Sequence, residues 1–93
     1  MKAIWNNTVV ADSNDTIVVE NNHYFPPQAI YPEYFKPSKT HTICPWKGEA
    51  SYYTISVGEE LNQDAAWFYS NPKSAAAQIK DYAAFWKGVL IIK

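Results

Sequence analysis

The stretch Thr40–Tyr53, with the sequence THTICPWKGEASYY, decides the expected fold. Its first residues should be extended, because Pro45 disfavours the α region for Cys44. The PWKG segment that follows is typical of a tight turn in which Gly48 takes a positive φ. Apolar and polar residues then alternate along Glu49–Val57, which indicates a half-buried antiparallel strand. We therefore expect extended chain on both sides of a tight turn.

The N-terminal half predicts further short strands. Thr8–Ala11 and Thr16–Glu20 are rich in β-branched residues, and the polar segment Asp12–Asp15 between them predicts a hairpin turn. Gln28–Ile30 follows two prolines and could form one helical turn. Tyr31–Lys39 combines aromatic residues with prolines, so it is expected to be a packed loop.

The C-terminal half adds strands and one helix. Ala65–Tyr69 predicts an aromatic strand, and Asn71-Pro72 is a pattern typical of an N-cap followed by the first helical residue. Ala83–Trp86 and Val89–Ile92 are apolar and are joined by Lys87-Gly88, which predicts a two-residue hairpin. The sequence therefore predicts a mainly β, antiparallel domain with one or two short helices, formed by residues 1–93 as a single unit.

Composition argues against several classes of function. The chain has a formal net charge of −1 and contains no Arg, the usual bidentate reader of phosphate and guanine, so no nucleic-acid binding is expected. A single Cys excludes an intramolecular disulfide and a four-Cys zinc site, and no metal or cofactor is predicted. No apolar stretch approaches the ~20 residues of a membrane span. We expect a cytoplasmic protein without a membrane partner.

The candidate catalytic residues are Cys44 and His41. Cys44 is either a small buried apolar residue or a reactive thiolate, since His41 and Lys47 lie three residues away on either side and nearby cations favour a thiolate. His41 is either a general base or a core histidine. On a strand the two side chains would point to opposite faces, so a direct pair requires a bend at Cys44.

The candidate ligand-binding residues surround the same turn. Lys47 is either a solvated turn residue or a contact for an anion. Glu20 ends a β-branched run and is either a solvated carboxylate or the polar partner of Lys47 in a cleft. Tyr24, Tyr52 and Trp67 are expected to form core or cleft walls, with a hydroxyl or an indole N–H that requires a hydrogen-bond partner.

The run His41–Tyr52, HTICPWKGEASY, resembles the signature of a small bacterial family known as domain of unknown function 427, which also carries a nucleotidyltransferase-like label. Other segments resemble the family in order: Thr8–Glu20, Tyr24–Pro26, Ala66–Pro72 and Ala83–Phe85. The resemblance implies a two-sheet antiparallel fold of the Mss4-like or β-tent type. The zinc held by paired Cys-x-x-Cys motifs in relatives of that fold does not carry over to a chain with one Cys. The acidic residues are scattered along the chain, so they do not form the carboxylate cluster of nucleotidyltransferases. Three Gly residues do not make a phosphate-binding loop.

Three functional hypotheses follow. The first is the binding of a small, anionic ligand in a cleft around the turn of the HTxCPWKG motif. The second is an enzyme that uses Cys44 or His41 as nucleophile or base, which a short contact between them would favour. The third is a protein-interaction module that docks through Tyr31–Phe35, which an exposed aromatic patch would favour.

Overall fold

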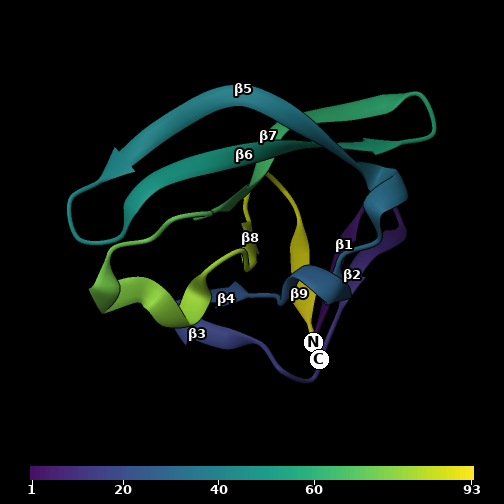
Figure 1. Cartoon of the computed structure of the whole chain (residues 1–93). Coiled ribbons are helices and arrows are strands. Elements are labelled where there is room, and N and C mark those ends of the chain that lie inside the picture. Colours follow the sequence, from purple (N-terminus) through teal and green to yellow (C-terminus); the bar gives the residue numbers. More distant parts are fainter.

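Nine strands form three antiparallel sheets in the computed structural model, which describes residues 1–93 (Figure 1). The strands are β1 (Lys2–Trp5), β2 (Thr8–Asp12), β3 (Ile17–Val19), β4 (Asn22–Tyr24), β5 (Phe35–Cys44), β6 (Gly48–Val57), β7 (Glu60–Phe68), β8 (Ala83–Phe85) and β9 (Leu90–Ile92). The orders are β5-β6-β7-β8 in one sheet, β2-β1-β9 in the second and β3-β4 in the third. The predicted mainly β, antiparallel class is confirmed, with three sheets where two were expected.

The hairpin β5–β6 is the longest feature of the fold, and its turn contains the expected positive φ of 113° at Gly48. The prediction of a loop over Tyr31–Lys39 was wrong beyond Tyr34, because β5 already begins at Phe35. Pro37 is tolerated there since β5 is an edge strand, where a missing N–H need not break the sheet ladder. The pairing of β5 with β6 is irregular between Pro37 and His41.

The hairpin expected between Thr8–Ala11 and Thr16–Glu20 does not form. The structure instead makes two shorter hairpins, β1–β2 and β3–β4, with two-residue turns at Asn6-Asn7 and Glu20-Asn21. All four turn residues have positive φ, between 52° and 66°. Such turns match the twist of paired strands, and Asn tolerates the left-handed conformation well. The segment between β2 and β3 therefore links two sheets.

The predicted helix at Asn71-Pro72 is replaced by a short 3₁₀ segment, Ser74–Ile79, which is broken at Ala76. Ala76 and Ile79 are its buried residues, and their spacing of three suits the three residues per turn of a 3₁₀-helix. Two further 3₁₀ turns occupy Pro27–Ala29 and Pro32–Tyr34.

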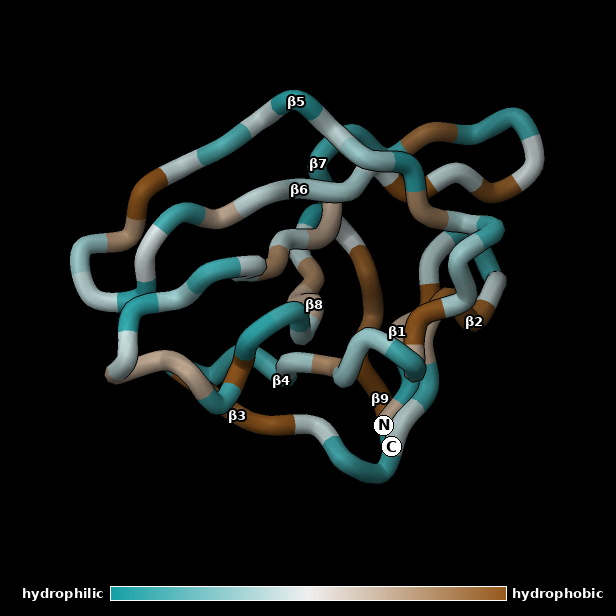
Figure 2. The backbone as a smooth tube through the Cα atoms, in the orientation of Figure 1, coloured by the Kyte–Doolittle hydropathy of each residue, from teal (hydrophilic) through white to brown (hydrophobic).

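The expected hairpin between the last two strands is also wrong. Lys87 and Gly88 do form a turn with positive φ, but β8 pairs with β7 whereas β9 pairs with β1. The apolar β9, brown in Figure 2, thus joins the sheet formed by the N-terminus. This connection ties the two larger sheets together.

Two clusters of buried side chains form the core. The first contains Phe25, Ile55 and Phe85, with the two Phe rings edge to face at 5.4 Å between centroids. The second contains the fully buried Tyr24 and Ile79, together with Ala50, Tyr69, Ala76 and Ala84. The second cluster lies next to the β5–β6 turn and supports the candidate site described below.

Candidate functional site

Lys47 is buried, although it lies in a turn. Its side chain is 8% exposed, and its Nζ donates a hydrogen bond to Glu20 Oε1 at 2.5 Å. The turn is held against the segment after β7, because the Lys73 N–H donates to the Lys47 carbonyl at 2.8 Å and Lys73 Nζ donates to the Pro45 carbonyl at 2.6 Å. The interpretation of Lys47 as a solvated turn residue was therefore wrong.

Aromatic rings surround the Lys47 ammonium. Its Nζ lies 5.4 Å from the ring centroid of Trp46 and 5.5 Å from that of Tyr69, both within the range of cation–π attraction. Burial by itself would lower the pKa of Lys47, but the hydrogen bond to Glu20 and the nearby Tyr24 and Tyr69 outweigh it, so the pKa is raised. The same hydrogen bond lowers the pKa of Glu20. Lys47 therefore remains a cation and is unsuited to act as an amine nucleophile.

A pocket of about 190 Å³ opens beside this ammonium. Four aromatic side chains line it together with Lys47: Tyr52, Trp67, Tyr69 and Trp86. Lys47 is the only charged residue of the lining, so it is the group in the pocket wall that can attract a charged atom of a ligand. The aromatic rings offer apolar surface for the rest of such a ligand.

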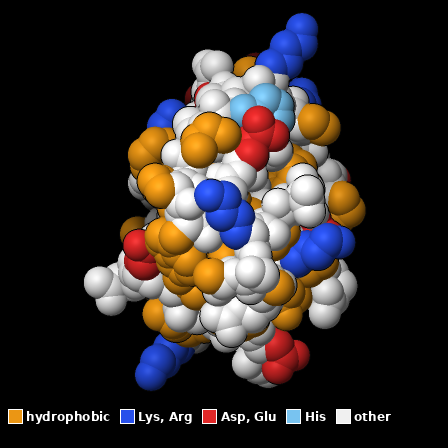
Figure 3. Space-filling model, turned by 60° about the vertical axis from the view of Figure 1, so that its left-hand side comes forward, with side chains coloured by type: hydrophobic (Ala, Val, Ile, Leu, Met, Phe, Trp, Pro, Cys, Tyr) orange, Lys and Arg blue, Asp and Glu red, His pale blue; other side chains and the backbone are white.

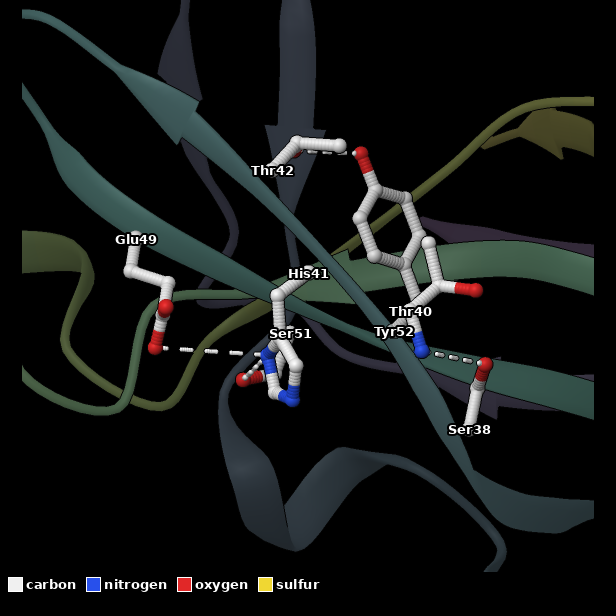
Figure 4. Close-up of polar contacts among 7 residues, drawn as sticks. All are labelled: Ser38, Thr40, His41, Thr42, Glu49, Ser51 and Tyr52. Atoms are coloured by element: carbon white, nitrogen blue, oxygen red, sulfur yellow. Dashed lines mark hydrogen bonds and ion pairs between the residues drawn. The ribbon is translucent and has the colours of Figure 1, made fainter.

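Hydrogen bonds fix two of the pocket walls. The Trp67 indole N–H donates to the hydroxyl of the buried Tyr24 at 3.1 Å. The Tyr52 hydroxyl shares a hydrogen bond of 2.9 Å with the Thr42 hydroxyl, as Figure 4 shows. The Trp67 indole N–H and the Tyr52 hydroxyl thus both have the hydrogen-bond partner that they require. Tyr24 does not line the pocket but holds Trp67, which does.

Trp86 and Tyr69 are pocket residues that the sequence analysis did not identify. The Trp86 indole N–H donates to the carbonyl of Asp64, which has a positive φ of 57° in β7. The Lys87 ammonium lies 5.2 Å from the centroid of the Trp86 ring. The tripeptide Trp-Lys-Gly occurs twice, at residues 46–48 and 86–88, and in both copies the Lys ammonium lies over the preceding Trp ring. This repeat was a signal that could have indicated Trp86.

His41 lies apart from the pocket, on the exposed side of β5. Its Nδ1 is 3.2 Å from Ser51 Oγ and 4.0 Å from Glu49 Oε1 (Figure 4). A Ser–His–acid triad uses different ring nitrogens for its serine and its carboxylate, whereas both contacts of His41 involve Nδ1. The geometry therefore does not form such a triad.

Cys44 faces the other side of β5, as alternation along a strand requires for residues three apart. It is half-buried and packs against the second core cluster. Neither Cys44 nor His41 lines the pocket, so the structure does not bring His41, Cys44 and Lys47 together in one cavity. Of the candidate residues, Lys47, Tyr52 and Trp67 line the pocket. Glu20 and Tyr24 lie outside the lining and are hydrogen-bonded to Lys47 and Trp67, respectively.

No group of three His, Cys, Asp or Glu side chains is arranged to hold a metal ion. No helix is both long and apolar enough to cross a membrane. On the face of the molecule seen in Figure 3, the Lys side chains are separated by hydrophobic, acidic and uncharged groups, so no continuous basic surface forms there.

Comparison with curated proteins gives no significant match. A family model does match, and it covers residues 1–91 of the 93-residue chain. The resemblance noted in the HTICPWKGEASY run thus extends over almost the whole fold, including all nine strands up to Ile91 of β9. The chain belongs to the family described as Domain of unknown function (DUF427).

Proposed function

We propose that this domain binds a small ligand that carries an anionic group, with the anion on Lys47 and the apolar part of the ligand against the aromatic walls. The observation that carries this proposal is the buried Lys47 ammonium, the only charged group lining the pocket. Burying a cation is costly unless it is paired, and Glu20 supplies that pair in the structure, so an anionic ligand would share the ammonium with Glu20 or replace it.

The dimensions of the pocket limit the size of the ligand. A closed apolar cavity of about 150 Å³ is large enough to hold benzene. The pocket beside Lys47 measures about 190 Å³ and is open to solvent on one side, so it has room for one ring and a small charged group. Trp67 and Trp86 lie edge to face with centroids 5.9 Å apart, which offers such a ring both a face and an edge to pack against.

The other two hypotheses receive less support. The enzyme hypothesis lacks the short contact between Cys44 and His41 that would favour it. An exposed aromatic patch over Tyr31–Phe35 would favour the interaction hypothesis, but only Tyr31 of its three aromatic residues is exposed, whereas Tyr34 and Phe35 are half-buried and pack against the first core cluster. We therefore retain the ligand-binding function. We also propose that the protein is cytoplasmic and has no nucleic-acid or membrane partner.

Saturation-transfer NMR with benzoate and its uncharged analogue benzamide tests this function. The two probes have nearly the same shape, so a preference for benzoate reports on the charge. Wild-type protein should transfer magnetisation to benzoate more strongly than to benzamide. Lys47→Met, which keeps a long apolar side chain, should remove this preference. Equal signals from both probes with wild-type protein would contradict the proposal.

A further inference from the structure

The two partners of the Lys47–Glu20 ion pair differ strongly in exposure. The Lys47 side chain is 8% exposed, whereas the Glu20 side chain is 54% exposed. Lys47 is held by its buried stem and by a turn whose backbone is hydrogen-bonded to Lys73. Glu20 projects from the two-residue turn between β3 and β4 and forms no other side-chain ion pair. One partner is therefore buried and held by the turn, whereas the other is half exposed to solvent.

Two aromatic rings and one carboxylate lie around the ammonium. Trp46 and Tyr69 present their rings to Lys47 Nζ at 5.4 and 5.5 Å from the centroids. The one oxygen that accepts a hydrogen bond from Nζ belongs to Glu20. Lys47 carries a single positive charge, so a ligand carboxylate that pairs with it would lie close to the like-charged Glu20 carboxylate and compete with it for that charge.

We propose that the Glu20 carboxylate occupies the position of the ligand's own anionic group, so that the pocket selects carboxylates and binds them by displacing Glu20. This inference rests on the proposed function and specifies the ligand class of the same site. The displaced Glu20 loses little, because its side chain is already half in water. The ligand carboxylate restores to Lys47 the same charge-assisted hydrogen bond.

Charge balance favours a carboxylate over a phosphate. A carboxylate neutralises the single positive charge of Lys47, as Glu20 does in the structure. A phosphate monoester carries a second negative charge at neutral pH, and no second cation lines the pocket to balance it. Lys73, whose backbone is hydrogen-bonded to Lys47, donates its Nζ hydrogen bond to the Pro45 carbonyl instead.

The experiment compares the affinities of benzoate and phenyl phosphate for wild-type protein and for Glu20→Gln, by following amide shifts in NMR titrations. Glu20→Gln removes the competing charge and should bind benzoate about tenfold more tightly, since the ligand no longer displaces a like charge. Glu59→Gln is the matched control: it removes one negative charge from the exposed β6–β7 turn, at the opposite end of the β5–β6–β7 sheet from the site (Figure 1), and should leave the affinity unchanged. Wild-type protein should bind benzoate more tightly than phenyl phosphate.

A second variant keeps the test decisive if Glu20→Gln folds poorly. Glu20→Asp keeps the charge but shortens its reach, so it should bind benzoate more tightly than wild type and less tightly than Glu20→Gln. Benzoate affinity that is unchanged or weaker in both variants would overturn this inference alone, because wild-type binding would still support the proposed function. Tighter binding of phenyl phosphate than of benzoate would also overturn it. Absence of benzoate binding to every variant and to wild type would overturn the proposed function, and this inference with it.

Discussion

Replacing Lys47 by Ala tests whether the residue is part of the packed structure. The substitution deletes three methylene groups and the ammonium from a residue that is 6% exposed. At ~0.8 kcal/mol for each buried methylene, the lost stem accounts for about 2.5 kcal/mol of unfolding free energy. Loss of the contacts with the Trp46 and Tyr69 rings adds ~0.5 kcal/mol or more. The expected destabilisation is therefore about 3 kcal/mol.

The variant Lys47→Met separates packing from charge. Met fills most of the same volume without a charge, and the Glu20 carboxylate left behind is 54% exposed and can be hydrated by water. Removing one partner of an ion pair is costly when it leaves the other charge buried, and the half-exposed Glu20 carboxylate avoids most of that cost. We expect Lys47→Met to stay within ~1 kcal/mol of wild type. Lys39→Ala, at an exposed position of β5, is the control and should change stability by less than ~0.5 kcal/mol.

Urea unfolding followed by tryptophan fluorescence measures all three variants. In a domain of this size, a loss of ~3 kcal/mol should also lower the melting temperature by at least ~10 °C. A cost below ~1 kcal/mol for Lys47→Ala would refute the reasoning, because it would mean that the side chain behaves as a solvated turn residue. An equal cost for Lys47→Met and Lys47→Ala would refute the assignment of the effect to the buried stem.

Four further predictions concern the surroundings of the pocket. Gly48→Ala should cost ~1–3 kcal/mol in a urea titration, because Gly48 has a φ of 113° that an L-residue rarely adopts; a neutral result would mean that the turn relaxes easily. Trp67→Ala should cost about 3 kcal/mol, because it leaves a void beside the buried Tyr24, and a loss below ~1 kcal/mol would contradict its role as a wall. The half-buried Cys44 should react with iodoacetamide more slowly than free cysteine, and a faster reaction would support the nucleophile hypothesis again. Because Lys47 lowers the pKa of Glu20, the ion pair stabilises the protein above the ordinary carboxyl pKa of 4.5, and this stability is lost as the pH falls through the lower folded value. As the pH is lowered below 4.5, the melting temperature of wild type should thus fall more steeply than the melting temperature of Glu20→Gln. Identical curves of melting temperature against pH would argue against the ion pair.

Local patterns predicted the parts of the fold that depend on local physics. Alternation along Glu49–Val57 predicted β6, and the Pro45–Gly48 segment predicted the turn with its positive φ at Gly48. Pairing between distant strands could not be predicted in this way. The β-branched run Thr8–Ala11 has equal local reason to pair with strands on either side, and its actual partner, β1, is chosen by the turn at Asn6-Asn7.

Contacts between residues far apart in the sequence also form the candidate site, so local patterns could not predict it in full. Lys47 lies in a turn sequence that is usually solvated, but it is buried among long-range contacts with Glu20, 27 residues away, with the Tyr69 ring and with the segment at Lys73. Glu20 was named as a partner of Lys47 from the sequence, but nothing local fixed that contact. Trp86 joins the pocket through a hydrogen bond to the carbonyl of Asp64, 22 residues away, a contact that no spacing rule predicts. The sequence thus indicated several of the residues that form the site. Which side chains come together around the pocket depends on long-range packing, which the sequence does not show.

The four tryptophans provide the most direct test that the pocket beside Lys47 is the ligand site. Each indole N–H gives its own signal in a proton–nitrogen correlation NMR spectrum, and Trp67 and Trp86 line the pocket whereas Trp5 lies on β1 in another sheet. Titration with benzoate should shift the indole signals of Trp67 and Trp86 in a saturable manner and leave that of Trp5 in place. Unchanged signals from Trp67 and Trp86 at saturating benzoate would contradict the assignment of the site, as would a shift confined to Trp5.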